Sequence, residues 1–208
     1  MNKEASITTL IFDFGGVLIN LDIQQCFTHF KALGIDNIES YLSNYGQSGL
    51  FLDWERGTVN PATFHAEVRK LCTGNPTDEQ IDQAWMSFLL DVPASKIELL
   101  KQLRSRYRIL MLSNTNPVHI ERSAAIAFGA HGTSIENLFD RCYLSYQIGL
   151  TKPDPAIFEY LLKEEGLNAE ECLFLDDGLK NIQTASALGF QTRLVEPEAS
   201  LDFLRQLS

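Results

Sequence analysis

The chain has 208 residues, of which 45% are hydrophobic and 21% are charged, and its formal net charge at pH 7 is −10. The length suits a single domain of ordinary size or a domain with a smaller insert, and the composition excludes a disordered chain. The acidic balance argues against nucleic acid and anionic membrane surfaces as partners, because both bind basic protein surfaces.

The first predicted element is a buried strand over residues 9–14, followed by Gly15 and Gly16. Its sequence, Thr-Leu-Ile-Phe-Asp-Phe, is short and almost continuously apolar, which is typical of a strand buried on both faces of a parallel sheet. Asp13 interrupts this run near its carboxyl end, where a buried carboxylate is costly unless a partner compensates for it. The two glycines would let the backbone approach a ligand closely.

Residues 20–94 differ from the rest of the chain, because they show helical periodicity and no convincing strand. Apolar residues recur at helical spacing over residues 23–33, 64–72 and 81–89. Residues 60–61, Asn-Pro, predict a helix N-cap with a first-turn proline. We therefore expect an all-helical insert after the first strand, where it would lie as a cap over the carboxyl edge of the sheet.

Four further buried runs follow the insert, and helical patterns separate most of them. The runs cover residues 108–113, 141–145, 172–176 and 192–195. Strands that alternate with helices predict an α/β fold with a doubly wound, mainly parallel, Rossmann-like sheet. We expect residues 1–18 and 95–208 to form this core and residues 19–94 to form the cap.

Polar residues gather where these strands are predicted to end. Ser113 and Asn114 follow one strand, Lys152 precedes a helix, and Asp176 and Asp177 follow another strand. Taken singly, each has an ordinary explanation as a turn residue, a surface charge or a helix cap. Together with the carboxylate of the first strand, they form the set that metal-assisted phosphoryl transfer requires. That set is a carboxylate nucleophile, a hydroxyl and a lysine for phosphate oxygens, and hard oxygen ligands for Mg²⁺.

The chain resembles a hydrolase of the haloacid dehalogenase (HAD) superfamily with a helical cap inserted after the first motif. The resemblance rests on four motifs, which occur in order at residues 12–17, 112–116, 152–155 and 174–177. Within the superfamily, these motifs and the segment Glu55-Arg56-Gly57 are similar to a bacterial branch that includes an α-D-glucose-1-phosphate phosphatase. The resemblance implies Mg²⁺-dependent hydrolysis of a small phosphorylated metabolite through an aspartyl-phosphate. The favoured substrate is a sugar phosphate such as a hexose 1-phosphate.

The resemblance also implies a metal site. Asp13 is the expected nucleophile and a ligand of Mg²⁺, and the backbone carbonyl of Gly15 is the expected second protein ligand. Asp177 would bind the metal directly, and Asp176 would support it through a water molecule or a hydrogen bond.

A second set of residues is expected to bind the substrate. Ser113 and Lys152 would hold the transferring phosphoryl group, and Lys152 would also neutralise the nucleophile. Asn114 would contribute its backbone N–H, and Gly16 would contribute a close approach of the backbone. Arg56, from the insert, could reach down to the substrate, although a solvated charge at a helix end explains it equally well.

One position departs from the family pattern. Phosphatases of this superfamily usually carry a second aspartate two residues after the nucleophile, as a general acid and base, and here that position is Gly15. Such a group contributes roughly a hundred- to ten-thousand-fold in rate. The substrate could have an easily displaced leaving group, such as an anomeric hydroxyl. Another group, such as Asp22, Glu55 or a bound water, could substitute for the aspartate, or turnover could be lost.

Two alternatives to a phosphatase follow from this departure. A 2-haloacid dehalogenase uses the same nucleophile without Mg²⁺ and also lacks the second aspartate. However, Asp176 and Asp177 place a metal-binding charge where a dehalogenase needs none. A catalytically silent phosphate-binding protein would have no need of an intact Asp13, Lys152 and Asp177, which argues against it.

The remaining residues predict ordinary structure. Residues 1–6 lead into no long apolar segment, and no run of about 18 apolar residues exists, so we expect a cytoplasmic protein without a membrane span. The four cysteines are far apart and match neither a zinc site nor a disulfide framework. Trp54 and Trp85 are expected in the core of the insert. The charges of residues 96–98 and 163–165 are expected on solvated helix faces.

Overall fold

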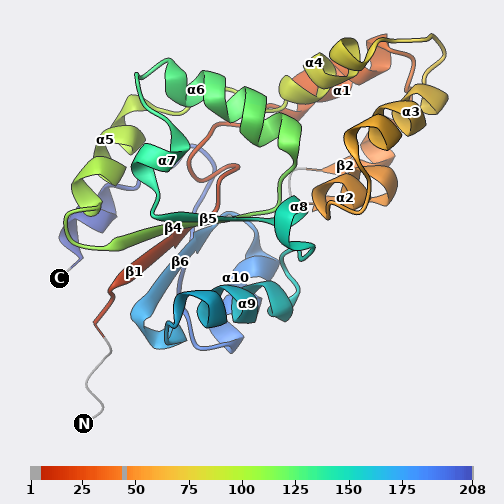
Figure 1. Cartoon of the computed structure of the whole chain (residues 1–208). Coiled ribbons are helices and arrows are strands. Elements are labelled where there is room, and N and C mark those ends of the chain that lie inside the picture. Colours follow the sequence, from red (N-terminus) through yellow and green to blue (C-terminus); the bar gives the residue numbers. More distant parts are fainter. Residues whose placement is uncertain (1–5, 44–45, 208) are drawn as a thin grey trace.

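A computed structural model describes residues 6–43 and 46–207 of the chain. Its centre is a five-stranded parallel sheet with the strand order β5-β4-β1-β6-β7 (Figure 1). The strands are β1 (Thr9–Phe12), β4 (Arg108–Ser113), β5 (Arg141–Leu144), β6 (Cys172–Asp176) and β7 (Gln191–Leu194). This confirms the predicted fold class. None of the described helices combines the length and the hydrophobicity that a membrane span requires.

Helices cover both faces of the sheet, which gives three layers (Figure 1). One face carries α5 (Ala94–Leu103), α6 (Ala125–Gly129) and α7 (Ile135–Leu138), and the other carries α9 (Pro155–Glu165) and α10 (Leu179–Ala187). Successive side chains of β1 alternate between these layers, because Leu10 and Phe12 pack in one hydrophobic cluster and Ile11 packs in the other. A strand buried on both faces explains the continuous apolar sequence of β1.

A second group of helices lies beyond the carboxyl edge of the sheet, and we call it the cap helices (Figure 1). It comprises α1 (Ile23–Ala32), α2 (Gly49–Glu55), α3 (Pro61–Leu71) and α4 (Asp78–Met86). Two short paired strands, β2 (Leu42–Ser43) and β3 (Gly46–Gln47), join them. Strands of two residues are too short to produce a periodic pattern, so the sequence did not predict them.

The cap helices have a hydrophobic core of their own. Trp54 and Trp85 are buried in it, as predicted, and Trp54 stacks on Phe64 with ring centroids 4.5 Å apart. Local signals set the start of α3, where the side chain of Asn60 accepts a hydrogen bond from the Thr63 N–H at 2.9 Å. The sequence alone therefore accounts for this helix start.

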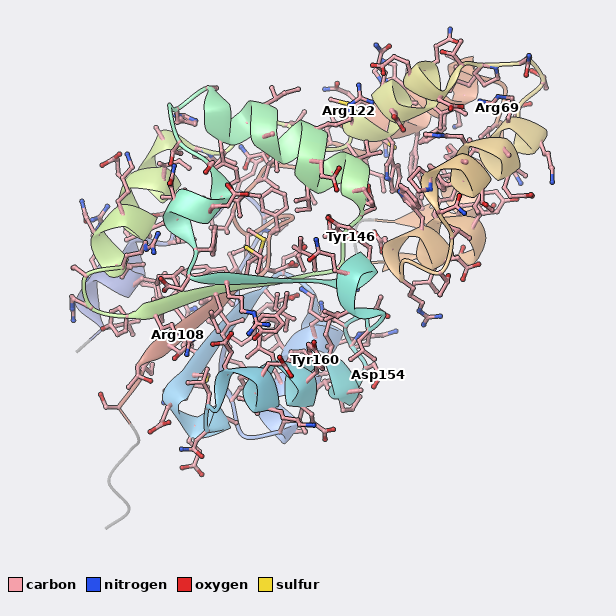
Figure 2. All side chains as sticks on the ribbon, viewed as in Figure 1. Arg69, Arg108, Arg122, Tyr146, Asp154 and Tyr160 are labelled. Carbon is pink, nitrogen blue, oxygen red and sulfur yellow. The ribbon has the colours of Figure 1, made fainter. Side chains whose placement is uncertain are left out.

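Paired linkers and one ion-pair cluster connect the cap helices to the rest of the protein. The linkers run antiparallel, because Leu21 pairs with Leu89. At the other contact, η2 (Val118–Ala124), a π-helical segment that leads into α6, packs against α4. Arg122 of η2 donates hydrogen bonds to Asp82 at 2.7 Å and to Glu79 at 2.6 Å (Figure 2). These are two of the contacts that join the cap helices to the rest of the protein.

Two charged residues expected at the surface are buried. Lys96 is 4% exposed, and its ammonium donates a hydrogen bond to the Val17 carbonyl at 2.6 Å. Burial lowers the pKa of Lys96. The side chain of Glu165 is also buried, and it accepts a hydrogen bond from the hydroxyl of Tyr143. Each of these charged side chains bonds to a residue distant in sequence, and local periodicity does not predict such partners.

Candidate active site

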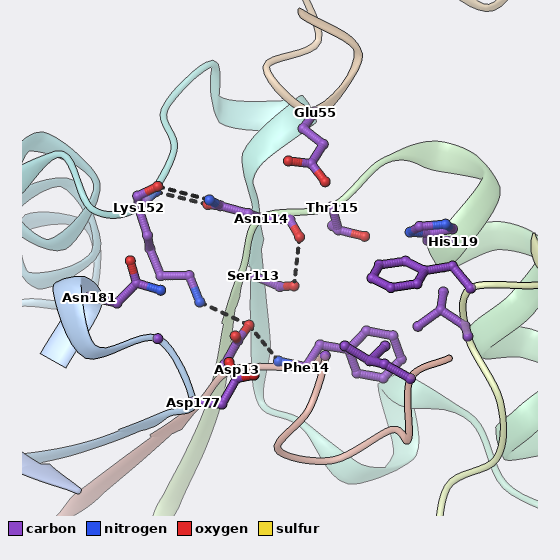
Figure 3. A pocket seen from close by; sticks show the side chains of 15 residues that line it. Asp13, Phe14, Glu55, Ser113, Asn114, Thr115, His119, Lys152, Asp177 and Asn181 are labelled. Atoms are coloured by element: carbon purple, nitrogen blue, oxygen red, sulfur yellow. Dashed lines mark hydrogen bonds and ion pairs between the residues drawn. The ribbon is translucent and has the colours of Figure 1, made fainter. Parts of the chain in front are cut away.

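A pocket lies at the carboxyl edge of the sheet, under the cap helices (Figure 3). Asp13 follows β1, Ser113 ends β4, Lys152 precedes α9, and Asp177 follows β6, and all four line this pocket. They meet because the carboxyl ends of neighbouring parallel strands share one edge of the sheet. The pocket encloses about 70 Å³, which is several times the space that one water molecule occupies.

Lys152 supplies a positive charge to this pocket, and it is buried between two carboxylates. Its ammonium lies 2.8 Å from Asp13 Oδ1 and 2.6 Å from Asp176 Oδ2. The side chain of Asn114 fixes the backbone of Lys152, because its amide donates to the Lys152 carbonyl and its oxygen accepts the Lys152 N–H, both at 2.8 Å. The side chain of Asn114 therefore positions Lys152, a role that the sequence did not predict.

The acidic pair after β6 divides into a buried and a pocket-lining residue. Asp176 is fully buried, and its Oδ1 accepts hydrogen bonds from the Gly178 N–H at 2.7 Å and the Asn181 side chain at 2.8 Å. Asp177 lines the pocket, whereas Asp176 lies behind it. Asp176 thus holds Lys152 and the loop, and Asp177 forms part of the pocket wall.

Gly15 and Gly16 let the loop after β1 pack closely against the acidic pair after β6. Gly16 has a φ of +72°, and a Cβ atom there would lie 2.4 Å from Asp177 Oδ2. A side chain at this position would therefore push the two loops apart. The N–H of Gly16 donates to the Ile19 carbonyl at 3.0 Å, which helps to shape the loop, and substrate binding by Gly16 stays a prediction. Gly15 lines the pocket.

The site carries more negative than positive charge. Burial raises the pKa of Asp13 well above its ordinary value of 3.8, and the neighbouring Asp176 and Asp177 raise it further against the effect of Lys152. Burial raises the pKa of Asp177 to about 6, and Asp176 adds to this. Burial alone would lower the pKa of Lys152, but Asp13 and Asp176 outweigh it and raise that pKa. One ammonium group therefore faces three carboxyl groups.

The donor atoms of this cluster fit Mg²⁺. One carboxylate oxygen from each of Asp13, Asp176 and Asp177 lies within 4.8 Å of the others. Mg²⁺ prefers hard oxygen ligands, and a divalent cation would balance the surplus negative charge. The residues present could therefore hold this metal.

The wall opposite Asp13 and Asp177 comes partly from the cap helices. Glu55, the last residue of α2, is 5% exposed, and its carboxylate points into the pocket from the side away from Asp13 (Figure 3). The hydroxyl of Ser145 donates to the Glu55 carbonyl at 2.6 Å and accepts the Thr115 N–H at 2.9 Å. Ser145, the first residue of α8 (Ser145–Ile148), thus ties α2 to the loop after β4.

Sequence reasoning included Thr115 in the motif at residues 112–116 without assigning it a role, and it missed Ser145, although a signal was present. Ser145 directly follows β5, and Thr115 comes two residues after the end of β4. Ser113 was selected because it is a polar residue at the carboxyl end of a strand. The same rule applied to β5 would have selected Ser145.

Arg56 does not line this pocket, so its contact with substrate stays a prediction. It caps the carboxyl end of α2 and is exposed, whereas its neighbour Glu55 lines the pocket. Successive helical residues differ by about 100° in direction, so one of the pair faces in and the other faces out. Gly57 allows the close approach, because a Cβ atom there would lie 2.0 Å from the Tyr146 carbonyl oxygen.

Comparison with known proteins gives one family match and several similar sequences. A model of the haloacid dehalogenase-like hydrolase family matches residues 7–189. D-ribitol-5-phosphate phosphatase from Bacteroides thetaiotaomicron is 35% identical over 202 residues, covering 97% of each chain. A sesquiterpene phosphatase from Aspergillus oryzae is 38% identical over 201 residues, covering 95% of this chain and 94% of that protein.

Solved structures are similar over the same length. A wild-type HAD family enzyme from Bacteroides thetaiotaomicron, in complex with magnesium and inorganic phosphate, is 37% identical with a TM-score of 0.89. The match covers 96% of this chain and 99% of that one. A HAD-like family hydrolase from Porphyromonas gingivalis is 35% identical with a TM-score of 0.90, covering 98% of both chains. The similarity therefore extends over the sheet and the cap helices alike.

Proposed function

The chain belongs to the haloacid dehalogenase-like hydrolases, and we propose that it is a Mg²⁺-dependent phosphatase acting on a small phosphomonoester. The observation that carries the proposal is the buried contact of Lys152 with Asp13 at 2.8 Å, beside Ser113 and Asp177 in one pocket. A carboxylate, a hydroxyl, an ammonium group and a metal-binding carboxylate suit phosphoryl transfer, which depends mainly on positioning and charge neutralisation. Relatives named as phosphatases support it.

In the first step, a carboxylate oxygen of Asp13 attacks phosphorus and forms an aspartyl-phosphate while the substrate alcohol leaves. The ammonium group of Lys152 and the hydroxyl of Ser113 hold the phosphoryl oxygens. Asp13, Asp177 and the Gly15 carbonyl would hold Mg²⁺, with Asp176 behind them. When bound, the metal would neutralise the charge on the phosphoryl group and orient it.

In the second step, water attacks the phosphorus atom of the aspartyl-phosphate, and the carboxylate of Asp13 is released. Lys152 stays in place through both steps, because Asn114 fixes its backbone and Asp176 pairs with its ammonium group. The site thus returns to its starting state with inorganic phosphate as product.

The proposed substrate class is a sugar or sugar-alcohol phosphate, with a hexose 1-phosphate as one candidate. The pocket is small in this arrangement, so a substrate of that size would enter only after the cap helices move. We place the cap in residues 19–94 and the core in residues 1–18 and 95–208. The similarity to a D-ribitol-5-phosphate phosphatase supports a polyhydroxylated substrate.

The test is phosphate release from p-nitrophenyl phosphate with Mg²⁺ and with EDTA, for the native protein and Asp13→Asn. We expect metal-dependent release that Asp13→Asn abolishes and that the exposed control Asp36→Asn retains. A panel with D-ribitol 5-phosphate and hexose 1-phosphates would then rank substrates by kcat/KM. No release by folded native protein would instead favour a phosphate-binding protein, and chloride release from a 2-haloacid would favour a dehalogenase.

A further inference from the structure

The proposed reaction needs a group that protonates the departing oxygen, and the core loop does not supply it. Asp13 attacks phosphorus in line with the leaving oxygen, so that oxygen points away from Asp13 and toward the cap helices. The position two residues after Asp13 is Gly15, which has no side chain to donate a proton. The group must therefore come from the wall that faces Asp13.

Few candidates line that wall. Among the described residues that line the pocket, the titratable side chains are those of Asp13, Glu55, His119, Lys152 and Asp177. Three of them, Asp13, Lys152 and Asp177, form the charged cluster around the nucleophile. Two remain on the side of the leaving group, namely Glu55 and His119 (Figure 3).

Both ring nitrogens of His119 form hydrogen bonds with the protein. Its Nε2 lies 3.1 Å from the Trp85 carbonyl, which only accepts hydrogen bonds, so Nε2 carries the hydrogen. Its Nδ1 then accepts from the side-chain amide of Asn116 at 3.1 Å. Burial lowers the pKa of His119 to about 4, so the ring is neutral and both nitrogens are occupied.

Asp22 was a candidate from the sequence to replace the missing aspartate at position 15, but Asp22 has a structural role. Its carboxylate caps the start of α1 by accepting the N–H groups of Gln24 at 3.0 Å and Gln25 at 3.1 Å. It does not line the pocket. Among the described side chains that line the pocket, Glu55 is therefore the one on the side of the leaving group whose carboxylate points into the pocket.

Contacts with the core place Glu55 at this position. Ser145 binds the Glu55 carbonyl at 2.6 Å and also binds the loop that carries Thr115. Gly57 has a φ of +66° and leaves room for the Tyr146 carbonyl, so the end of α2 seats directly on the core. The backbone of Glu55 is therefore held against the loop that follows β4.

We propose that Glu55 is the general acid and base of the reaction, in place of the aspartate that is absent at Gly15. In the first step, an oxygen of Asp13 forms a bond to phosphorus, and the bond to the alcohol oxygen breaks. The Glu55 carboxyl group gives its proton to that oxygen. In the second step, water attacks phosphorus, the Glu55 carboxylate takes the proton of the water, and the electron pair of the broken bond returns to Asp13.

The inference rests on the proposed phosphatase function, and Glu55→Gln tests it by separating the two steps. With p-nitrophenyl phosphate, the first step needs little proton donation, but hydrolysis of the aspartyl-phosphate still needs a base. We therefore expect a burst of about one nitrophenolate per active site, followed by turnover slowed roughly a hundredfold or more. With an alkyl phosphate, the first step itself becomes slow, and no burst of alcohol appears.

Two further variants serve as controls. Glu67→Gln changes a cap carboxylate whose side chain is 44% exposed and pairs with Lys70, and it should behave as the native protein. Glu55→Asp keeps a carboxyl group and should turn over faster than Glu55→Gln.

Several results would overturn the inference. They are native turnover in Glu55→Gln, a loss of p-nitrophenyl phosphate turnover in that variant without a burst of nitrophenolate, and equal rates for the Gln and Asp variants. Failure of the phosphatase proposal would look different, since the native protein itself would then release no phosphate.

Discussion

Replacing Asp177 by Asn should stabilise the metal-free protein at neutral pH, although Asp177 is a proposed metal ligand. Burial and the neighbouring Asp176 raise the pKa of Asp177 from 3.8 to about 6. The folded protein therefore disfavours the ionised form of this carboxyl group more than the unfolded chain does. The carboxylate that prepares the site for a cation is a source of instability when no cation is bound.

The free-energy cost of ionising Asp177 in the folded protein follows from its pKa values in the unfolded and the folded state. At about 1.4 kcal/mol per pH unit, a rise from 3.8 to about 6 corresponds to about 3 kcal/mol. The folded-state pKa is the higher one, so the ionisation of Asp177 costs no stability below about pH 4, costs more as the pH rises to about 6, and costs the full amount above it. Asp177→Asn should accordingly raise the melting temperature at pH 7.5 by up to about 6–12 °C.

The measurement is thermal unfolding in EDTA at pH 7.5 and pH 4, for the native protein, Asp177→Asn and the exposed control Asp36→Asn. The gain in Asp177→Asn should vanish at pH 4 and be absent from the control. Added Mg²⁺ should stabilise the native protein more than the variant, because the variant lacks a ligand. A destabilised Asp177→Asn at pH 7.5 in EDTA would refute the charge argument.

Three further substitutions test contacts that position the active site or stabilise the fold. Gly57→Ala should lower kcat/KM at least tenfold in phosphatase assays, because its methyl group would meet the Tyr146 carbonyl at 2.0 Å and unseat α2; unchanged kinetics would contradict this. Asn114→Ala should lower kcat while circular dichroism stays native, because the Lys152 backbone loses two hydrogen bonds; full activity would remove its positioning role. Lys96→Met should lower the free energy of unfolding by about 1–3 kcal/mol in urea titration, because a buried carbonyl loses its donor; a more stable variant would contradict this.

The sheet and the surroundings of Asp13 were predictable from the sequence because both depend on local patterns. β1 is short and apolar because it is buried on two faces, and Asp13 follows it directly. The polar residues that end β4 and follow β6 needed no distance information, since parallel strands bring their carboxyl ends to one edge. Topology therefore converts a position along the chain into proximity in space.

The parts that could not be predicted depend on contacts between distant segments. The clamp of Asn114 on Lys152 joins residues 38 apart, and the hydrogen bond of Ser145 to Glu55 joins residues 90 apart. Lys96 finds the carbonyl of Val17 across 79 positions. Periodicity describes which face of an element is apolar, but it does not identify the partner of a polar group.

The location of the proposed acid couples chemistry to the seating of the cap helices. Glu55 belongs to α2, whereas Asp13 and Lys152 belong to the sheet, so lifting the cap helices would remove the acid and leave the nucleophile in place. An aspartate at position 15 would instead act from the core, and a Cβ atom there would lie 3.4 Å from Leu21, an ordinary contact.

Introducing that aspartate into the weakened enzyme tests this difference. Gly15→Asp in the Glu55→Gln background should restore turnover of alkyl phosphates at least tenfold in steady-state phosphate release, because a carboxyl group again reaches the leaving oxygen. Gly15→Asn in the same background has similar size without a proton to exchange and should restore nothing. Equal recovery in the two double variants would mean that position 15 acts by packing, and no recovery in the folded aspartate variant would mean that the missing function is not proton transfer.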